Sequence, residues 1–318
     1  MARDAPFTFT TRAPAKVNWT LEVLGRRPDG YHEIVSLLST VSLCDRLRLT
    51  SAPAWSVTVD APEPLRAELL SGDNLVQRAL SALRGGAGPA LPAAHLHLEK
   101  RIPAAAGLGG GSSDGAATLR LVIAYWRRTV GPAAVAPLRP RLLAIAAGLG
   151  ADVPFFLRGG TQLARGRGEL LTPIAAEPWR WLVLLVPPLS LPHKTARLYA
   201  LLTPRHYTDG TRTARLAAAL AAGDDEAPCR EAFNAFDAVA EQAFPGLGRY
   251  RALLADACGG PAHLSGAGPA LFACAPDAVA ARAAAARLRR MGLAAWAVST
   301  LGRGRAARVV VRRVATRT

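Results

Sequence analysis

The sequence predicts an α+β fold of two domains, and three observations indicate it. Stretches with the alternating apolar–polar pattern of strands are interspersed with stretches of helical periodicity along all 318 residues. A glycine-rich turn joins a strand to a helix near residue 110, and the chain becomes helix-rich after one buried strand near residue 183. The length suits two ordinary domains. We place their boundary near Ala164, which gives domains of residues 1–164 and 165–318.

The first half contains strands and helices in alternation. Residues 26–30 (RRPDG) form a turn, with proline and glycine placed for it. Residues 74–86 are expected to form a helix that ends at glycines. The other expected elements are strands at 17–25, 32–51 and 95–99 and helices beginning near 116 and 141.

The second half begins with a buried strand at 179–188 that prolines terminate. Helical periodicity predicts three helices, at 213–223, 230–244 and 276–292. Between the last two, residues 262–274 are expected to form a strand, a glycine turn and a second strand. Residues 308–313 have the pattern of a final strand with charged flanks.

The charge balance is strongly basic. There are 39 Lys and Arg against 23 Asp and Glu, a formal net charge of +16. Such a charge suits nucleic-acid binding, but the basic residues are scattered along the chain. A positive field that attracts small phosphorylated substrates explains the charge as well. We therefore expect small-molecule partners rather than nucleic acid.

Cysteine usage and hydropathy indicate the compartment. Cys44, Cys229, Cys258 and Cys274 are far apart and contain no C-x-x-C pair, so we expect reduced thiols rather than zinc or a disulfide framework. No apolar run approaches the length of a membrane span, and the first residues lack the apolar core of a signal peptide. The prediction is a cytoplasmic protein without a membrane partner.

The glycine-rich turn, KRIPAAAGLGGGSSDGAATLRL at residues 100–121, predicts an anion site. Ser112, Ser113 and Asp114 are residue types that cap a helix. A helix N-terminus behind glycines offers free N–H groups and a positive dipole to a phosphate. No lysine follows the glycines, which excludes a P-loop. No acid lies between Gly115 and Ala151 to bind a ribose, which excludes a dinucleotide fingerprint.

Three further stretches carry groups that phosphoryl transfer needs. Lys16 and Asn18 lie two residues apart and hence on one face of a strand. Asp152 lies at an expected helix-to-strand junction, where Pro154 makes Val153 extended. A second glycine turn, residues 265–269, can approach a phosphate. A carboxylate that aligns the attacking hydroxyl, with a lysine that keeps it ionised, would complete the chemistry.

These stretches resemble the GHMP kinase superfamily, whose phosphate loop has the pattern P-x-x-x-G-L-G-[GS]-[GS]-[SA]; residues 103–113 contain it in full. The match extends to PAKVNWTLEVLGRRPDGYHEI, DNLVQRA, LGADVPFFLRGGTQLARGRGE and LSGAGPALF. Within the superfamily, the chain is most similar to members that phosphorylate a cytidine diphosphate derivative of a sugar alcohol. The resemblance implies a two-domain kinase with its active site between the domains, which uses ATP and Mg²⁺.

The resemblance also implies roles for individual residues. Lys16 and Asp152 would be the catalytic pair, and Asn18, Tyr31, His32 and Tyr199 would bind the cytidine-bearing substrate. Ser113 would lie near Mg²⁺. The ATP-binding residues would be Lys100, Pro103, Ala104, Ala105, Ala106, Gly107, Leu108, Gly109, Gly110, Gly111, Ser112 and Ser113.

The chain departs from the family pattern twice. Asn234-Ala235-Phe236-Asp237 replaces Asn-Asp-Leu-Glu, and Lys194-Thr195 replaces Ser-Thr. Two alternatives remain open. A homoserine or mevalonate kinase of the same superfamily would not need Tyr31 and His32. A nucleic-acid-binding protein on a related fold would not need Lys16 and Asp152 beside an ATP loop.

Overall fold

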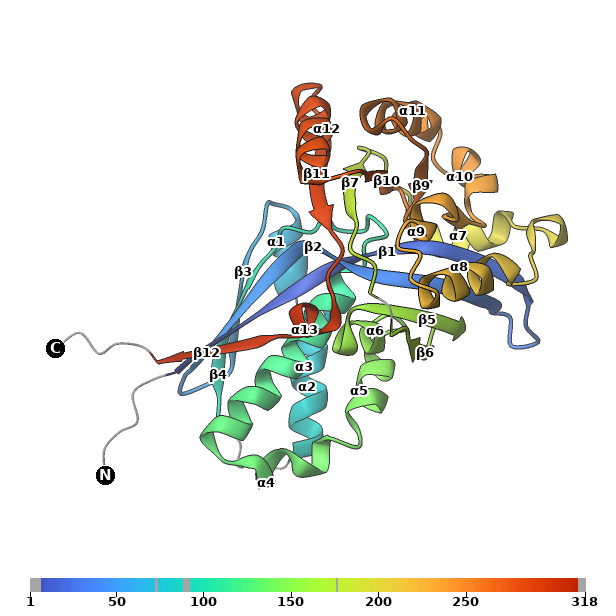
Figure 1. Ribbon diagram of the computed structural model, residues 1–318. Coiled ribbons are helices and arrows are strands. Elements are labelled where there is room, and N and C mark those ends of the chain that lie inside the picture. Colours follow the sequence, from blue (N-terminus) through green and yellow to red (C-terminus); the bar gives the residue numbers. More distant parts are fainter. Residues whose placement is uncertain (1–6, 72–73, 88–91, 176, 314–318) are drawn as a thin grey trace.

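The computed structural model describes residues 7–71, 74–87, 92–175 and 177–313. Figure 1 shows two sheets, each covered by helices, and the long strands β1 and β2 of one sheet cross the middle of the molecule. The strands are β1 (Phe7–Arg26), β2 (His32–Ser51), β3 (Ser56–Asp60), β4 (Ala94–Glu99), β5 (Thr161–Gly166), β6 (Leu170–Pro173), β7 (Trp181–Val186), β8 (Phe233–Asn234), β9 (Ala262–Leu264), β10 (Leu271–Ala275), β11 (Ala294–Ser299) and β12 (Val309–Arg313).

The α-helices vary from single turns to a helix of 20 residues, α3. They are α1 (Leu65–Leu70), α2 (Leu75–Ala87), α3 (Gly110–Thr129), α4 (Pro132–Val135), α5 (Leu142–Leu149), α6 (Val153–Arg158), α7 (Lys194–Leu201), α8 (Thr211–Ala221), α9 (Ala227–Arg230), α10 (Asp237–Ala243), α11 (Leu247–Cys258), α12 (Ala278–Arg290) and α13 (Arg303–Ala306). Short 3₁₀ turns span Ala136–Leu138 and Pro204–His206.

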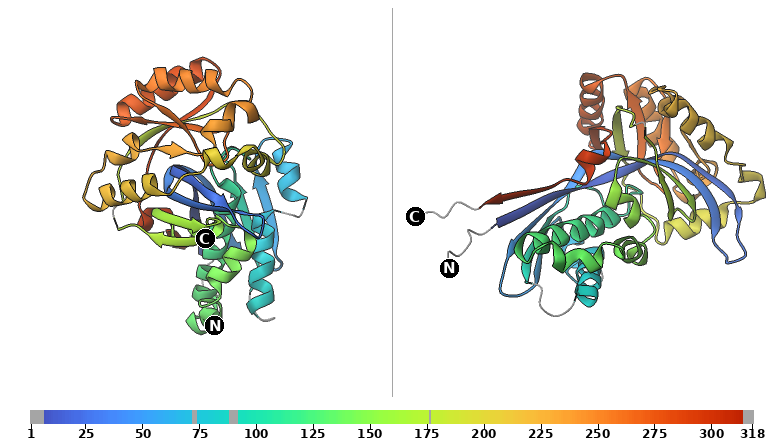
Figure 2. Two further views of the ribbon diagram at one scale, coloured as in Figure 1. Left: turned by 90° about the vertical axis from the view of Figure 1, so that its right-hand side faces the viewer. Right: turned by 60° about the horizontal axis from the view of Figure 1, so that its bottom comes forward.

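The first sheet is built on the antiparallel pair β1 and β2. Within the described residues it has eight strands, in the order β12-β1-β2-β4-β3, with β5 beside β2, β6 beside β5 and β8 beside β1. β12 returns from the end of the chain to pair with the start of β1 (Figures 1 and 2). Ala164 lies inside β5, and the sheet continues through β6. The division into residues 1–164 and 165–318 therefore stays a prediction.

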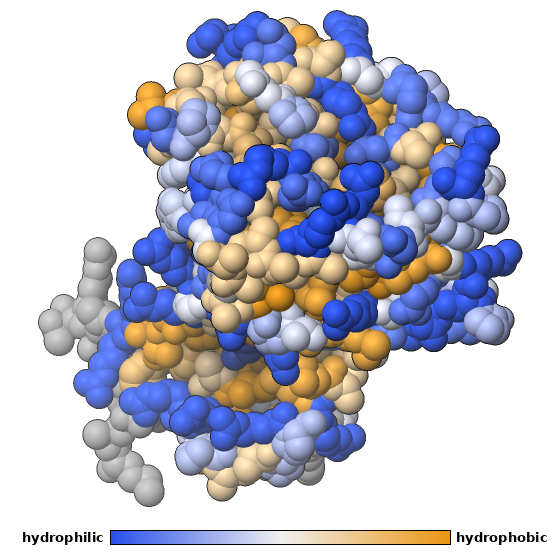
Figure 3. Space-filling model, turned by 45° about the vertical axis from the view of Figure 1, so that its right-hand side comes forward, coloured by the Kyte–Doolittle hydropathy of each residue, from blue (hydrophilic) through white to orange (hydrophobic). Residues whose placement is uncertain are grey.

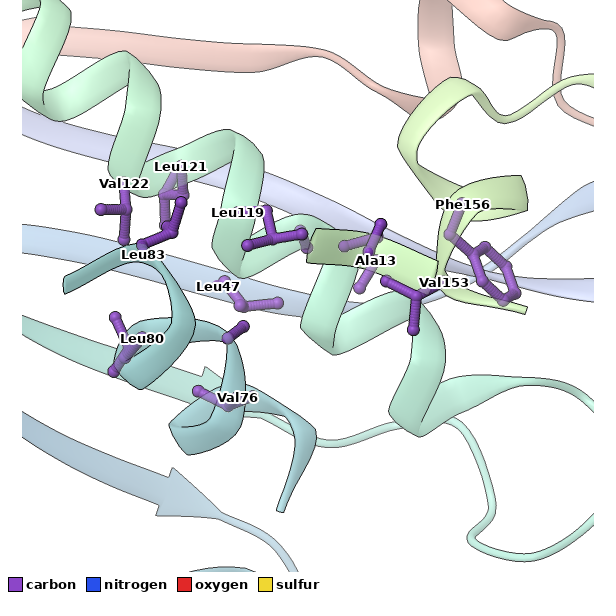
Figure 4. Packing of buried hydrophobic residues seen from close by; sticks show 14 of the residues in the cluster. Ala13, Leu47, Val76, Leu80, Leu83, Leu119, Leu121, Val122, Val153 and Phe156 are labelled. Carbon is purple, nitrogen blue, oxygen red and sulfur yellow. The ribbon is translucent and has the colours of Figure 1, made fainter. Parts of the chain in front are cut away.

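The second sheet contains β11, β7, β10 and β9, all antiparallel. Helices α11 and α12 pack against it, and α2 and α3 pack against the first sheet. Figure 4 shows the first core, in which Leu83 of α2 and Leu119 of α3 lie against Leu47 of β2. A third cluster joins the sheets, with Trp19 edge-on to Phe272 at 5.6 Å. The two halves therefore share buried apolar surface, which stabilises their relative position.

Most predicted elements are confirmed, including β7, α8, the β9–β10 hairpin and β12. The predicted helix at 230–244 is wrong in its first half. β8 interrupts it, because Phe233 and Asn234 pair in parallel with β1. The turn at 26–30 is confirmed, and the Asp29 carboxylate accepts a hydrogen bond of 3.1 Å from the Tyr31 N–H.

The expectation of reduced thiols is wrong for two of the four cysteines. Cys229 of α9 and Cys274 of β10 form a disulfide, while Cys44 and Cys258 are free. Sequence spacing could not reveal this pair, because the fold brings together residues 45 positions apart. None of the helices in the described part of the chain has the length and apolar character needed to span a membrane.

Candidate active site

The phosphate loop, residues 103–113, runs from β4 into α3. Ser112, Ser113 and Asp114 are expected to cap the helix, but α3 begins before them. Its N-cap is Gly109, which has a left-handed φ of 73°, and no side chain caps the helix. Ser112, Ser113 and Asp114 therefore lie in the first turns. The leading N–H groups of a helix have no intrahelical acceptor. Without a side-chain cap, this terminus presents them to a ligand.

The second glycine turn, residues 265–269, packs directly on the phosphate loop. The Ala270 N–H donates to the Ala106 carbonyl at 3.0 Å. A Cβ on Gly107 would lie 2.4 Å from the Ser265 carbonyl oxygen, so only glycine fits there. The two glycine-rich segments, one from each half of the chain, thus form one surface.

Lys16 lies beneath both segments. Its backbone N–H donates to the Leu108 carbonyl at 3.0 Å, and its ammonium donates to the Asn18 side-chain oxygen. Asn18 in turn donates to Ser36 at 2.8 Å. The predicted common face of Lys16 and Asn18 is therefore confirmed. Burial lowers the pKa of Lys16, and the negative charge of Asp152 partly offsets this.

Asp152 is the N-cap residue of α6. The expectation of an extended Val153 is wrong, because Val153 is the first residue of this helix and Pro154 follows it. Proline is tolerated in the first turn, where its missing N–H would have no partner. No ion pair joins Asp152 and Lys16, both of which the structure describes, but their charges interact. The carboxylate therefore remains available to a substrate hydroxyl.

Lys100 lies in a buried cluster at the entrance of the loop. Its ammonium donates to Asp45 of β2 and, at 2.7 Å, to Asp114 of α3. Its side chain is only 6% exposed. Burial would lower the pKa of Lys100, but Asp114 and Asp45 together raise it. The ammonium is thus engaged by protein carboxylates and fixes β4 to α3; its predicted ATP contact stays a prediction.

The three aromatic candidates lie on the hairpin between β1 and β2 and on α7. His32 stacks on Tyr199, with ring centroids 4.5 Å apart and an interplanar angle of 14°. Tyr31 is 56% exposed, and the Arg167 guanidinium lies 4.7 Å above its ring. Tyr199 is largely buried; burial and Asp152 raise the pKa of its hydroxyl to about 12.

Three residues near the site had no predicted role. Asp45 holds Lys100, and Asn234 donates to the Leu264 and Gly266 carbonyls at 3.0 and 2.9 Å, which supports the second glycine turn. The Lys194 ammonium donates to the Ala105 carbonyl at 2.6 Å and to the Gly268 carbonyl. Asn234 and Lys194 lie in the two stretches that depart from the family pattern, which was the only sequence signal for them.

Comparison with known families agrees with this geometry. Residues 74–160 match the model of the GHMP kinases N terminal domain, and residues 216–293 match that of the GHMP kinases C terminal. The chain belongs to the GHMP kinase family and is a small-molecule kinase. GHMP kinases use ATP, and the phosphate loop lies within the first matched segment.

Among its relatives, the chain resembles one particular enzyme. A 4-diphosphocytidyl-2-C-methyl-D-erythritol kinase from Dehalococcoides mccartyi is 40% identical, over 92% of this chain and 99% of the relative. The kinase of that name from Pelotomaculum thermopropionicum is 38% identical, over 89% and 94% of the two chains. The crystal structure of a 4-(cytidine 5'-diphospho)-2C-methyl-D-erythritol kinase superposes with a TM-score of 0.76 at 37% identity, over 92% of this chain and 99% of the other.

More distant structures share the fold alone. A mevalonate kinase from L. major superposes with a TM-score of 0.67 at 16% sequence identity, over 92% of this chain and 96% of the other. The expected α+β kinase fold, with matches to both GHMP domains, is therefore confirmed.

Proposed function

We propose that this chain transfers the γ-phosphate of ATP to the 2-hydroxyl of 4-diphosphocytidyl-2-C-methyl-D-erythritol, a step in the synthesis of isoprenoid precursors. One observation carries the proposal. The charge of Asp152 acts both on Lys16, beneath the phosphate loop, and on Tyr199, in the aromatic stack. A carboxylate whose charge reaches both groups suits an acceptor that has a nucleobase at one end and a reacting hydroxyl at the other.

In this proposal Asp152 is the general base. It accepts the proton of the acceptor hydroxyl as the oxygen attacks the γ-phosphorus. Lys16 keeps Asp152 ionised and offsets the charge that develops on the transferred group. Because Asn18 accepts a hydrogen bond from the Lys16 ammonium, it directs the lysine toward the loop.

The phosphate loop and the first turn of α3 would bind the ATP phosphates, with Ser113 near Mg²⁺. The Ser113 hydroxyl is buried and has no hydrogen-bond partner in the described residues. Mg²⁺ prefers oxygen ligands and commonly takes only one or two from protein, with substrate phosphates completing the set. The ion would neutralise charge on the transferred phosphate. The Ser113 oxygen and the phosphate oxygens of ATP would therefore suit Mg²⁺ that arrives bound to ATP.

Tyr31, His32 and Tyr199 would bind the cytosine. A base gains about 1–3 kcal/mol by stacking on an aromatic ring. Because His32 covers one face of Tyr199, a base that stacks on that face must displace the imidazole, whose ring could then donate to the cytosine edge. The same proposal places the enzyme in the cytoplasm and assigns its +16 charge to anionic substrates. On the face of the molecule that Figure 3 shows, hydrophilic residues are interspersed with hydrophobic ones.

The experiment is an assay of ADP formation with MgATP and a panel of alcohols: 4-diphosphocytidyl-2-C-methyl-D-erythritol, mevalonate, homoserine and methylerythritol phosphate. We expect turnover with the cytidine compound alone. Efficient turnover with mevalonate or homoserine would assign the chain to another branch of the family. Efficient turnover with methylerythritol phosphate, which lacks the cytidine, would remove the aromatic residues from acceptor recognition.

A further inference from the structure

Lys194, the first residue of α7, places a second lysine, partly buried, at the site. Its ammonium donates to one carbonyl of each glycine-rich segment, Ala105 in the phosphate loop and Gly268 in the second turn. In the proposed function, the phosphate loop binds the ATP phosphates, and the second turn packs on it. Two carbonyls leave one of the three N–H groups of an ammonium for a further acceptor.

The charges around Lys194 do not neutralise it. Both of its described hydrogen-bond partners are uncharged carbonyls, and Lys16, from β1, repels it. Asp152, at the start of α6, acts on Lys16 and Tyr199. Burial and Lys16 lower the pKa of Lys194 to about 8. A cation partly withdrawn from water is costly unless an anion compensates it, so the site is suited to receive one.

We propose that Lys194 is a phosphate-binding residue of this active site, whose remaining N–H donates to a phosphate oxygen of a bound substrate. The phosphate belongs either to ATP or to the diphosphate of the cytidine-bearing acceptor. The acceptor alternative rests on the proposed function, whereas the ATP alternative needs only membership of the kinase family. Lys194 would then hold both glycine-rich segments against the bound phosphate.

The test is calorimetric titration of the full chain at pH 8.5 with MgATP and, separately, with CDP, each in two buffers of different ionisation enthalpy. At that pH about three quarters of Lys194 is neutral, given a pKa of about 8. A phosphate that raises this pKa makes the protein take up protons on binding. The variants are Lys194→Met and Lys194→Arg, and the matched control is Arg197→Met, which removes an exposed charge from the same helix.

We expect Lys194→Met to weaken one of the two ligands about tenfold or more, as for loss of a charged hydrogen bond, and to reduce the proton uptake with that ligand. Lys194→Arg should retain most of the affinity, and Arg197→Met should behave as the parent. Unchanged affinity for both ligands, or weaker binding with unchanged proton uptake, would overturn the proposal and leave Lys194 a structural link. Failure of the proposed acceptor reaction would appear instead as absent turnover, with MgATP binding still measurable.

Discussion

Gly266 offers a way to move the catalytic lysine without altering it. Its φ is +54°, and a Cβ there would lie 2.7 Å from the Lys16 ammonium nitrogen and 3.3 Å from the Asn18 oxygen. The ammonium is the end of a flexible side chain, whereas the other close atom, the Gly107 carbonyl oxygen at 3.2 Å, is backbone. In Gly266→Ala we therefore expect the ammonium to shift by several tenths of an ångström.

The magnitude has two parts. Alanine in a left-handed conformation costs about 1–2 kcal/mol, which lowers the melting temperature by a few degrees. Misplacement of a catalytic group by about 1 Å can cost about a hundredfold in rate. Because the expected shift is smaller than this, we expect kcat to fall by about tenfold or more, while the KM for ATP changes little, since the loop N–H groups remain in place.

Gly259→Ala is the matched control, because Gly259 has a φ of +68° and nothing within 4 Å of a Cβ. Steady-state kinetics and thermal unfolding of the two variants separate backbone strain from the lysine shift. Both should lose similar stability, and only Gly266→Ala should lose kcat. Equal kcat in the two variants would refute the placement of Lys16 at the reacting groups.

Three further predictions concern single side chains. Asp152→Asn should abolish turnover with ATP affinity within a few-fold, because it removes an interaction made mainly in the transition state; near-normal kcat in the folded variant would remove Asp152 from the role of base. Tyr31→Ala and Tyr199→Ala should each raise the KM of the cytidine substrate about ten- to a hundredfold and leave the KM of ATP nearly unchanged. An equal rise of KM for both substrates would indicate that the tyrosine ring only packs against the protein. Lys100→Met removes the ammonium partner of the buried carboxylates of Asp45 and Asp114 and should cost about 3–5 kcal/mol of unfolding free energy; denaturant unfolding at the parent's stability would contradict the buried cluster.

The sequence predicted the site wherever its parts are local in the chain. The strand, loop and helix at residues 95–122 follow from glycine content and periodicity, and the pairing of Lys16 with Asn18 follows from the alternation of a strand. Both are confirmed. The α6 helix shows the limit of such rules, because Pro154 restricts its neighbour only on average. Tertiary packing placed Val153 in a helix instead.

Contacts between distant segments could not be predicted. Asp45 of β2 meets Lys100 only because β2 and β4 are neighbours in the sheet. Lys194 reaches the phosphate loop across 89 positions of sequence. His32, rather than Tyr31, stacks on Tyr199, since successive side chains after the turn point in different directions. The family motif identified Lys100, His32 and Tyr199, but only the fold shows which residues are their neighbours.

The central claim is tested most directly by product analysis. After incubation of the chain with MgATP and 4-diphosphocytidyl-2-C-methyl-D-erythritol, phosphorus NMR with proton coupling locates the new phosphate. We predict one equivalent of ADP and a single product phosphorylated at the 2-hydroxyl. A phosphate on another hydroxyl would contradict the proposed function. So would the absence of any product from this substrate if the same protein preparation phosphorylates a different alcohol.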